Sequence, residues 1–257
     1  MTVTTRIRVL TANFRLAPES AEDIAAGHGW EDGRRDLTIN LLKAWRPSVI
    51  CGQECSTVIR EDLAAALGGN WRRSRSGNVV VWFDSNHHTL LGFDRFNLPS
   101  PPPVEGATFD PRRLVLVHLR MNATGDDWWA ASTHFTPGEP DWQTRQMRAA
   151  VGFITDNGNL RDTIFGGDIN AGGTDTPGPR QVARAAGLYD LRGKLAAPRI
   201  KNVTSNTFNG WEPARHDGFW IDDILTGDNF QPYYARVIDT NGASDHQWII
   251  ASSIQLT

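Results

Sequence analysis

Acidic, amide and imidazole residues recur along this sequence wherever a predicted strand ends. Carboxylate and amide oxygens suit a hard cation such as Mg²⁺ or Mn²⁺. Each residue alone has a structural explanation as a helix cap or an Asx turn. Their shared position points to chemistry, because the strand ends of a packed sheet gather at one edge. The residues are Asn13, Glu54, His134, Asp168 with Asn170, Asp222 with Asp223, and Asp245 with His246.

Hydrophobic periodicity predicts the strands that position these residues. One strand covers residues 6–13, with Ile7, Val9 and Thr11 on one face, and a Gly-rich loop follows it through Gly33. A buried strand runs from Val49 to Gln53 and ends at Glu54. Further strands are predicted at 79–83, 114–119, 128–133, 163–165, 219–225 and 248–252, and helices at 36–45, 61–67, 141–156 and 179–186. Many strands with few, spaced helices predict an α/β sandwich of packed sheets with helices outside.

Two segments interrupt this pattern. Pro99 to Pro103 could be a domain linker, but it is short and lies between two strand signals, so we expect a surface loop inside one domain. The dense basic cluster of Trp71, Arg72, Arg73 and Arg75 is either a solvated turn after a helix or a substrate-contacting loop.

The composition is that of an ordinary globular protein, and the length is typical of an enzyme-sized fold. The chain has 257 residues, 40% of them hydrophobic and 21% charged, which excludes a disordered chain or a coiled coil. The 26 basic and 29 acidic residues give a net charge of −3, so there is no polybasic coat for nucleic acid. We see no signal segment and no apolar run of about 18 residues, and we expect a cytoplasmic protein, with a secreted or phage origin still open.

The two cysteines are expected to be free thiols. If the segment from Cys51 to Cys55 is extended, the two residues lie about 13 Å apart, too far for a disulfide bond. Free thiols fit a reducing compartment.

Six segments together resemble the endonuclease/exonuclease/phosphatase superfamily, which has the deoxyribonuclease-I-like fold. Each motif alone is weak, but the six follow the family's order across nearly the whole chain. They are the strand ending at Asn13, the run from Pro47 to Glu54, Ser132-Thr133-His134, Gly167-Asp168-Ile169-Asn170, Ile221-Asp222-Asp223-Ile224-Leu225 and Ser244-Asp245-His246. The resemblance implies one domain over residues 1–257, a four-layer α/β (α+β) sandwich of two packed mixed sheets flanked by helices.

The resemblance also implies a divalent-metal phosphoesterase site. Asn13 and Glu54 would bind Mg²⁺ or Mn²⁺, with Asp245 as a further direct or water-mediated ligand. Asp168 would hold and polarise the attacking water, and Asn170 would orient Asp168 and the phosphate. Because a carboxylate with a pKa near 3.9 is a weak base, positioning is favoured over full proton abstraction.

Two histidines complete the implied catalytic set. His134 and His246 would face the phosphate, and Asp222 would favour the protonated form of His246. Asp222 falls on the aspartate of the family's I-D-x-I pattern, although the neighbouring Asp223 departs from that pattern and keeps the assignment open. Since side chains alternate along a strand, Asp223 should point the opposite way.

Two substrate contacts are predicted beside this set. Arg113 matches a position where some members carry a phosphate-contacting arginine, and Arg112 is an equal contender. Trp211 lies on a loop before the Asp222 strand, where it could stack on substrate or pack beneath the loop.

The sequence alone leaves the class of substrate open. A nuclease acting on DNA or RNA is the first hypothesis, with arginines in a local patch offsetting the neutral overall charge. A small-molecule phosphatase or phosphodiesterase for sugar, nucleotide, inositol or lipid head-group phosphates is the second. The third, a binding module of the same fold without catalysis, is disfavoured by the retained polar residues. We expect a monomer with no membrane span.

Overall fold

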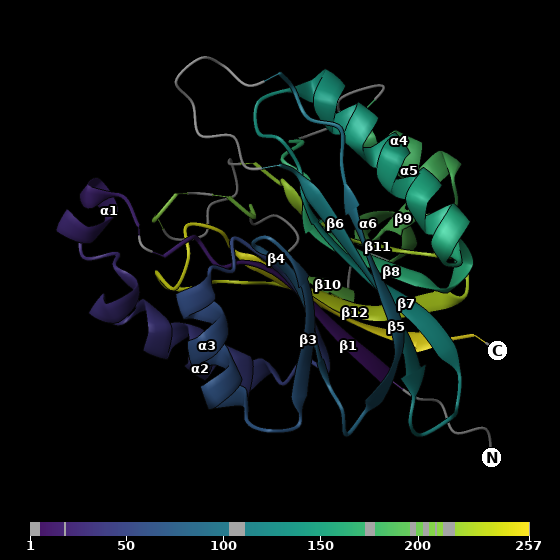
Figure 1. Cartoon of the computed structure of the whole chain (residues 1–257), viewed down its shortest axis with the longest axis horizontal. Helices are drawn as coiled ribbons and strands as arrows, with labels where there is room; N and C mark the ends of the chain where they lie inside the picture. The colour runs from purple at the N-terminus through teal and green to yellow at the C-terminus, as the bar shows by residue number, and fades with distance from the viewer. Residues whose placement is uncertain are drawn as a thin grey trace.

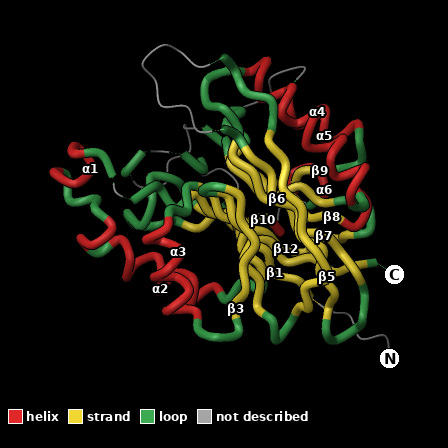
Figure 2. Tube along the Cα trace, viewed as in Figure 1, coloured by secondary structure: helices red, strands yellow, loops and turns green. Residues whose placement is uncertain are grey.

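The computed structural model has four layers, two β-sheets packed face to face between two pairs of helices (Figure 1). It describes residues 6–17, 19–102, 111–172, 178–195, 199–202, 206–208, 210–212 and 219–256. In Figure 2 the strands form the centre of the molecule, with α2 and α3 on one side and α4 and α5 on the other. This arrangement confirms the predicted four-layer sandwich.

The first sheet has seven strands in the order β10-β12-β13-β1-β2-β4-β3. Strands β1 (Arg6–Asn13) and β2 (Val49–Gln53) are parallel and form its centre, with α2 (Arg34–Trp45) between them in the chain. The other bounds are β3 (Trp71–Ser76), β4 (Val79–Asp84), β10 (Ile200–Lys201), β12 (Phe230–Ile238) and β13 (Trp248–Gln255). Helix α3 (Thr57–Leu67) follows β2.

The second sheet has six strands in the order β5-β6-β7-β8-β11-β9. Strands β7 (Asp127–His134) and β8 (Thr163–Asp168) are parallel, and α4 (Pro140–Asn157) connects them. The remaining elements are β5 (His88–Asn97), β6 (Arg113–Met121), α5 (Pro179–Ala185), β9 (Tyr189–Asp190), α6 (Leu191–Lys194) and β11 (Asp222–Thr226).

Alternation along the strands produces three separate apolar layers. In β1, Val9 points into the core between the sheets, whereas Leu10 packs under α2 and α3. In β6, Val115 faces the same central core and Leu116 packs under α4. Two sheets with buried faces on both sides account for the almost continuous apolar runs of the central strands.

Close packing between the sheets explains one glycine of the Gly166-Gly167 pair. A Cβ on Gly166 would lie 2.7 Å from Cβ of Cys51 in the opposite sheet. Glycine therefore lets β8 approach β2, and β8 is the strand that ends at Asp168. Cys51 and Cys55 are free, as expected. Both are also fully buried, and burial raises the pKa of both thiols to about 12.

Several sequence-based expectations need correction. The basic cluster from Trp71 is the edge strand β3, neither a turn nor a substrate loop, and Arg73 lies over the Trp82 ring. Strands β5 and β12 had not been predicted, and the Gly-rich loop contains the short helices α1 (Ala21–Ala25) and η1 (Trp30–Asp32). The segment from Pro99 joins two paired strands of one sheet, although Pro103 lies outside the described residues. Among the described helices, none has the length and apolarity to cross a bilayer.

A buried histidine makes the fold sensitive to acid. Neither ring nitrogen of His88 has a hydrogen-bond partner among the described residues, and its ring lies edge-on to Trp128. Burial lowers the pKa of His88 to about 4. Because the unfolded chain protonates near pH 6.5 and the folded chain only near 4, this residue should cost about 3 kcal/mol of folding stability as pH falls across that window.

We therefore expect His88→Leu to flatten the acid limb of the stability profile. Denaturant unfolding at pH 7.5 and pH 4.5 should show a smaller loss of unfolding free energy in the variant than in the wild type. Equal losses in the two proteins would show that folding does not lower the pKa of His88, so that the folded protein also binds the proton at pH 4.5.

Candidate active site

Strand register brings three of the predicted catalytic residues into one row. His134 at the end of β7 lies beside Asp168 at the end of β8, and Asp168 lies opposite Asp222 at the start of β11. The distance from His134 Nε2 to Asp168 Oδ2 is 3.5 Å. The end of the second sheet therefore presents an imidazole and two carboxylates on adjacent strands.

The first sheet brings Asn13 and Glu54 to the same place. Asn13 ends β1 and Glu54 follows β2, and the two strands are parallel neighbours. Asn13 Nδ2 donates to Glu54 Oε1 and to Asp168 Oδ2, both at 3.1 Å. This amide links the two sheets at the edge where their polar residues meet.

His246 completes the cluster with a carboxylate partner. Its Nδ1 lies 2.9 Å from Asp222 Oδ2, and its Nε2 lies 3.8 Å from Asp168 Oδ2. Burial alone would lower the pKa of His246, but Asp222 and Asp168 raise it to about 10. Burial lowers the pKa of His134 to about 4, against the opposing effect of Glu54. At neutral pH one imidazole is therefore cationic and the other neutral.

The neighbouring acid, Asp223, serves a different purpose. It points away from the cluster, where its Oδ2 accepts a 2.7 Å hydrogen bond from Arg180 Nε of α5. Arg180 also donates to the carbonyls of Ala171 and Trp220. The structure thus places Asp222, rather than Asp223, against His246, as the alternation of side chains along β11 predicts.

Asp168 is more basic than its residue type suggests. Burial and the nearby Asp222 raise its pKa, although His246 and the hydrogen bonds from Asn13 and Asn170 oppose the shift. The Asn170 N–H donates to Asp168 Oδ1 at 3.0 Å, and Asn170 Nδ2 donates to the carbonyl of Phe135 at 2.9 Å. The shift, to about 8, makes the ionised form of Asp168 a stronger base than an aspartate with a pKa near 3.9, but at pH 7 most of Asp168 is protonated. Turnover that needs Asp168 as a proton acceptor should therefore rise with pH between 7 and 9.

Oxygen donors for a hard cation lie around Glu54. Burial opposes ionisation of Glu54, but the hydrogen bonds from Asn13 and from the Leu16 N–H and the charge of His246 lower its pKa, so the carboxylate is charged at neutral pH. Asp245 lies nearby, and Arg15 Nη1 is 3.6 Å from its Oδ2. Asn13 Oδ1 accepts the Arg15 N–H at 2.9 Å, so in this structure the Asn13 oxygen is occupied by the backbone.

A second group also has metal-binding geometry. Asp168, Asp222 and His246 each offer a ligand atom, and these atoms lie within 4.8 Å of one another. Oxygen donors prefer Mg²⁺ or Mn²⁺, whereas a site with an imidazole also suits transition metals. Both the Glu54 region and this buried group could therefore bind a metal, and the cationic His246 disfavours the second.

Backbone strain accumulates at the same place. Arg15, Glu54 and Asn170 have φ values of 54°, 53° and 51°, in the left-handed region that residues with a side chain rarely adopt. Such conformations cost of order 1 kcal/mol or more and tend to occur at functional sites. All three residues lie in or beside the polar cluster.

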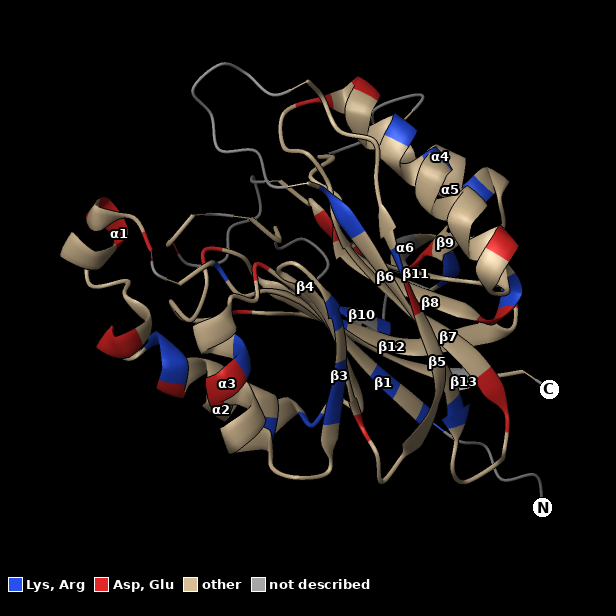
Figure 3. Cartoon of the chain, in the orientation of Figure 1, with Lys and Arg blue, Asp and Glu red and all other residues tan. Residues whose placement is uncertain are grey.

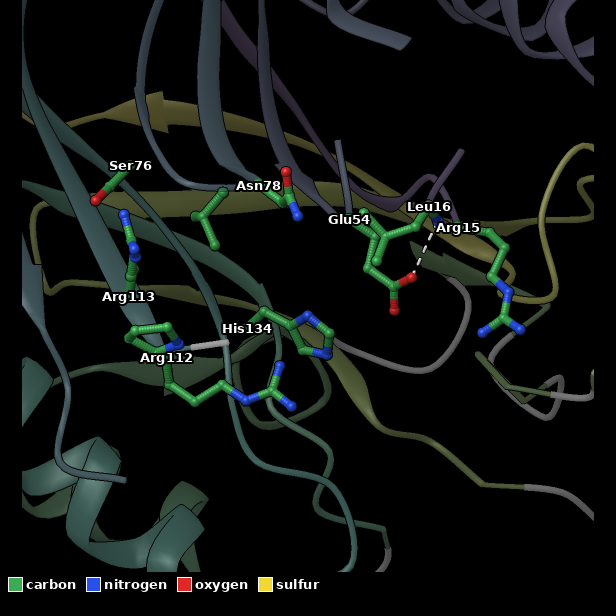
Figure 4. A pocket seen from close by; sticks show the side chains of 10 residues that line it. Arg15, Leu16, Glu54, Ser76, Asn78, Arg112, Arg113 and His134 are labelled. Carbon is green, nitrogen blue, oxygen red and sulfur yellow. Dashed lines mark hydrogen bonds between the residues drawn. The ribbon is translucent and has the colours of Figure 1, made fainter. Parts of the chain in front are cut away.

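An open cleft of about 280 Å³ borders the cluster on the side of Glu54 and His134 (Figure 4). Glu54 and His134 line it together with Arg15, Arg112 and Arg113. Arg113 packs on Gly77, where a Cβ would lie 3.2 Å from its Nε. Both arginines considered from the sequence therefore line the cleft, which can accept an anion beside Glu54 and His134.

Comparisons with solved structures agree with this fold. An endonuclease/exonuclease/phosphatase family protein from Bacteroides thetaiotaomicron superposes with a TM-score of 0.84 at 19% identity, over 99% of both chains. The chain has the endonuclease/exonuclease/phosphatase fold. A mannosyl-6-phosphatase from the same organism gives a TM-score of 0.81 at 18% identity, over 96% of this chain and 99% of that one. TDP2 from D. rerio, complexed with a single-stranded DNA product, gives 0.70 at 16% identity, over 97% and 99%. No protein-family model and no curated protein matches the sequence.

Within the endonuclease/exonuclease/phosphatase fold, Trp211 reaches the polar cluster through Asp23, which pairs with Arg15. Its ring stacks on His28 with centroids 4.1 Å apart, and its Nε1 donates to Asp23 at 3.0 Å. These contacts favour packing beneath the loop over stacking on a substrate. The exposed aromatic nearest β11 is Phe219, with 65% of its surface accessible.

The structure adds positioning residues that the sequence did not indicate. The buried Arg34 of α2 donates to the carbonyls of Phe14, Arg15 and Ala243, and it pairs with Glu19. It thereby ties the loop after Asn13 to the loop before Asp245. No motif could have revealed it, because the partners are backbone carbonyls far apart in sequence.

Two glutamines of α4 support the other half of the site. Gln143 Nε2 donates to the carbonyls of Thr136 and Asn170, and Gln146 Oε1 accepts the Thr136 N–H at 2.9 Å. They fix the loops that follow His134 and Asp168. Both are buried and lie three residues apart on one face of the helix, and this spacing is the one sequence signal that could have identified them.

Proposed function

We propose that this protein is a divalent-metal-dependent phosphoesterase. The main support is the convergence of His134, Asp168 and the Asp222–His246 pair beside Glu54 at the edge shared by the two sheets. The fold is also that of phosphoesterases such as the mannosyl-6-phosphatase. These two observations come from independent features, the side-chain geometry and the backbone.

Glu54 would hold the cation, with Asp245 as a further oxygen ligand, and we expect Mg²⁺ or Mn²⁺. Asn13 would join them if its Oδ1 exchanged the Arg15 N–H for the cation. The all-oxygen donor set fits a hard cation, and the ionised, strained Glu54 has the charge such a ligand needs. When bound, the cation supplies Lewis-acid stabilisation of a phosphate oxygen or the leaving group.

Side chains of the protein would activate the attacking water and bind the phosphate. Asp168 would orient the attacking water and accept its proton at Oδ2, the oxygen that both imidazole Nε2 atoms approach. The cationic His246, held by Asp222, would donate a hydrogen bond to the phosphate, and the neutral His134 would provide a second contact. Pairs of groups whose pKa values are driven apart in this way are typical of acid–base sites.

For the substrate we favour phosphodiester bonds of DNA or RNA. Arg15, Arg112 and Arg113 line one cleft with a single carboxylate, Glu54, so the cleft favours a substrate with more than one negative group. TDP2, which shares the fold, was solved with a DNA product.

A small-molecule phosphatase is the second candidate. The cleft volume of about 280 Å³ is at the low end for a ligand pocket, and the net charge of −3 gives little support to duplex binding. The mannosyl-6-phosphatase shows that the same fold accepts a sugar phosphate.

A substrate panel distinguishes these candidates. Plasmid DNA, single-stranded DNA, RNA, bis-p-nitrophenyl phosphate and hexose phosphates should be incubated with Mg²⁺ or Mn²⁺, each with and without chelator. We expect metal-dependent release of product from at least one ester, with nucleic acid cleaved fastest. Cleavage of monoesters alone would favour the phosphatase, and no turnover of any ester with either metal would refute a phosphoesterase.

A further inference from the structure

A second concave site lies at the opposite end of the first sheet. Strand β1 carries Asn13 at its end, and Arg6, seven residues earlier, lies about 23 Å away at its start. There a pocket of about 580 Å³ opens between the start of β1, the end of α2 and the start of β3. Its volume falls in the range of small-molecule sites.

Four basic side chains line this pocket. Arg6 and Arg8 come from β1, and Lys43 and Arg46 come from the end of α2. Figure 3 shows Lys and Arg in blue along β1 and β3 and beside the end of α2. Within the described part of the chain, none of the four has a carboxylate within ion-pair distance. Arg6 instead lies over the Tyr233 ring.

The lining also contains one carboxylate, Asp84, against the four basic side chains. Asp84 Oδ1 accepts the Asn86 N–H at 2.9 Å, and Asp84 Oδ2 is 3.9 Å from His87. The C-terminal dipole of α2 favours a cation at Lys43 or Arg46 but gives no reason for two arginines on the neighbouring strand. The concentration of like charge in one concavity is unfavourable unless an anion offsets it.

The rest of the lining suits a ligand with an apolar part. Leu42, Ala66 and Leu67 form an apolar wall, and Trp71 stands beside it at the start of β3. We propose that this pocket binds a di- or triphosphate group, either as free polyphosphate or as part of a nucleotide. It would be separate from the cleft at Glu54 and would act independently of the proposed hydrolysis.

Paired variants test this proposal in the full-length protein. Lys43→Gln/Arg46→Asn removes two charges from the pocket, and asparagine tolerates the left-handed φ of 45° at position 46. Arg112→Gln/Arg113→Gln removes the same charge from the catalytic cleft and serves as the control. Calorimetric titration with sodium tripolyphosphate and with ATP should be done in chelator at constant ionic strength.

We expect the wild type and the cleft variant both to retain the pocket site for each probe, even if binding at the cleft is lost in the cleft variant. The pocket variant should bind both probes at that site about tenfold or more weakly. Tighter binding of ATP than of tripolyphosphate would support a nucleotide whose adenine ring packs on the apolar wall. Equal binding of the two probes would support recognition of the phosphate groups alone. Because the pocket variant loses repulsion, its Tm should equal or exceed that of the wild type. Absence of binding, or loss of binding only in the cleft variant, would overturn the proposal.

Discussion

Replacing Asp168 with asparagine is expected to lower the turnover of a phosphate ester about 10³-fold. Asparagine keeps the size and one acceptor oxygen of the side chain but cannot take a proton from water. Asp168 accepts the Asn170 N–H at Oδ1 and Asn13 Nδ2 at Oδ2. An asparagine that keeps its oxygen toward Asn170 retains the first hydrogen bond and loses the second. The measurement is kcat for the best ester of the panel, with metal saturating.

Stability provides the control for this variant. Because burial and Asp222 raise the pKa of Asp168, the folded protein bears a cost for ionising it that grows as pH rises above the unfolded value near 3.8. A neutral amide removes that cost and also loses the Asn13 hydrogen bond to Oδ2, so the two effects oppose each other and the Tm of Asp168→Asn in chelator should stay close to that of the wild type. A large fall in Tm, or activity near that of the wild type, would contradict the assigned role.

The adjacent acids of β11 allow a matched comparison. Asp222→Asn removes the main electrostatic partner of His246, so the pKa of His246 should fall and the imidazole should lose its charge at neutral pH. We expect kcat to fall about 10³-fold, because a cationic hydrogen-bond donor to the phosphate is lost.

Asp223→Asn changes the same chemical group one residue away. It breaks a buried ion pair with Arg180, which should lower the unfolding free energy by about 3 kcal/mol while kcat remains within a few-fold of the wild type. Thermal unfolding and kinetics on both variants check the contrast. If Asp223→Asn were the inactive variant, the assignment drawn from the I-D-x-I pattern would be reversed.

The sequence predicts the strands that carry the site because those strands have strong, local signals. Apolar runs such as 49–53 and 163–165, ended by glycine or a polar residue, identify buried strands without any tertiary information. The polar residue at each strand end is then placed by register, as His134, Asp168 and Asp222 demonstrate.

The edge strands, and the residues that hold the site through contacts distant in sequence, have no such local signal and could not be predicted. Strand β3 reads as a basic turn because its exposed face carries arginines, and β5 has exposed Leu90 and Phe93 where alternation would place polar residues. Arg34 acts through carbonyls of loops that come together only in the folded chain. The raised pKa of Asp168 likewise depends on burial and on Asp222, neither of which is visible in its residue type.

The position of the bound metal tests the account most directly, since the structure offers two groups that could hold it. Crystals soaked in Mn²⁺ should be compared for the wild type and Glu54→Gln by anomalous scattering. We predict a single manganese peak beside Glu54 and near Asp245 in the wild type, absent or much weaker in the variant. A peak coordinated by Asp168, Asp222 and His246, with none at Glu54, would contradict the division of this site into a metal ligand set and a proton-transfer set.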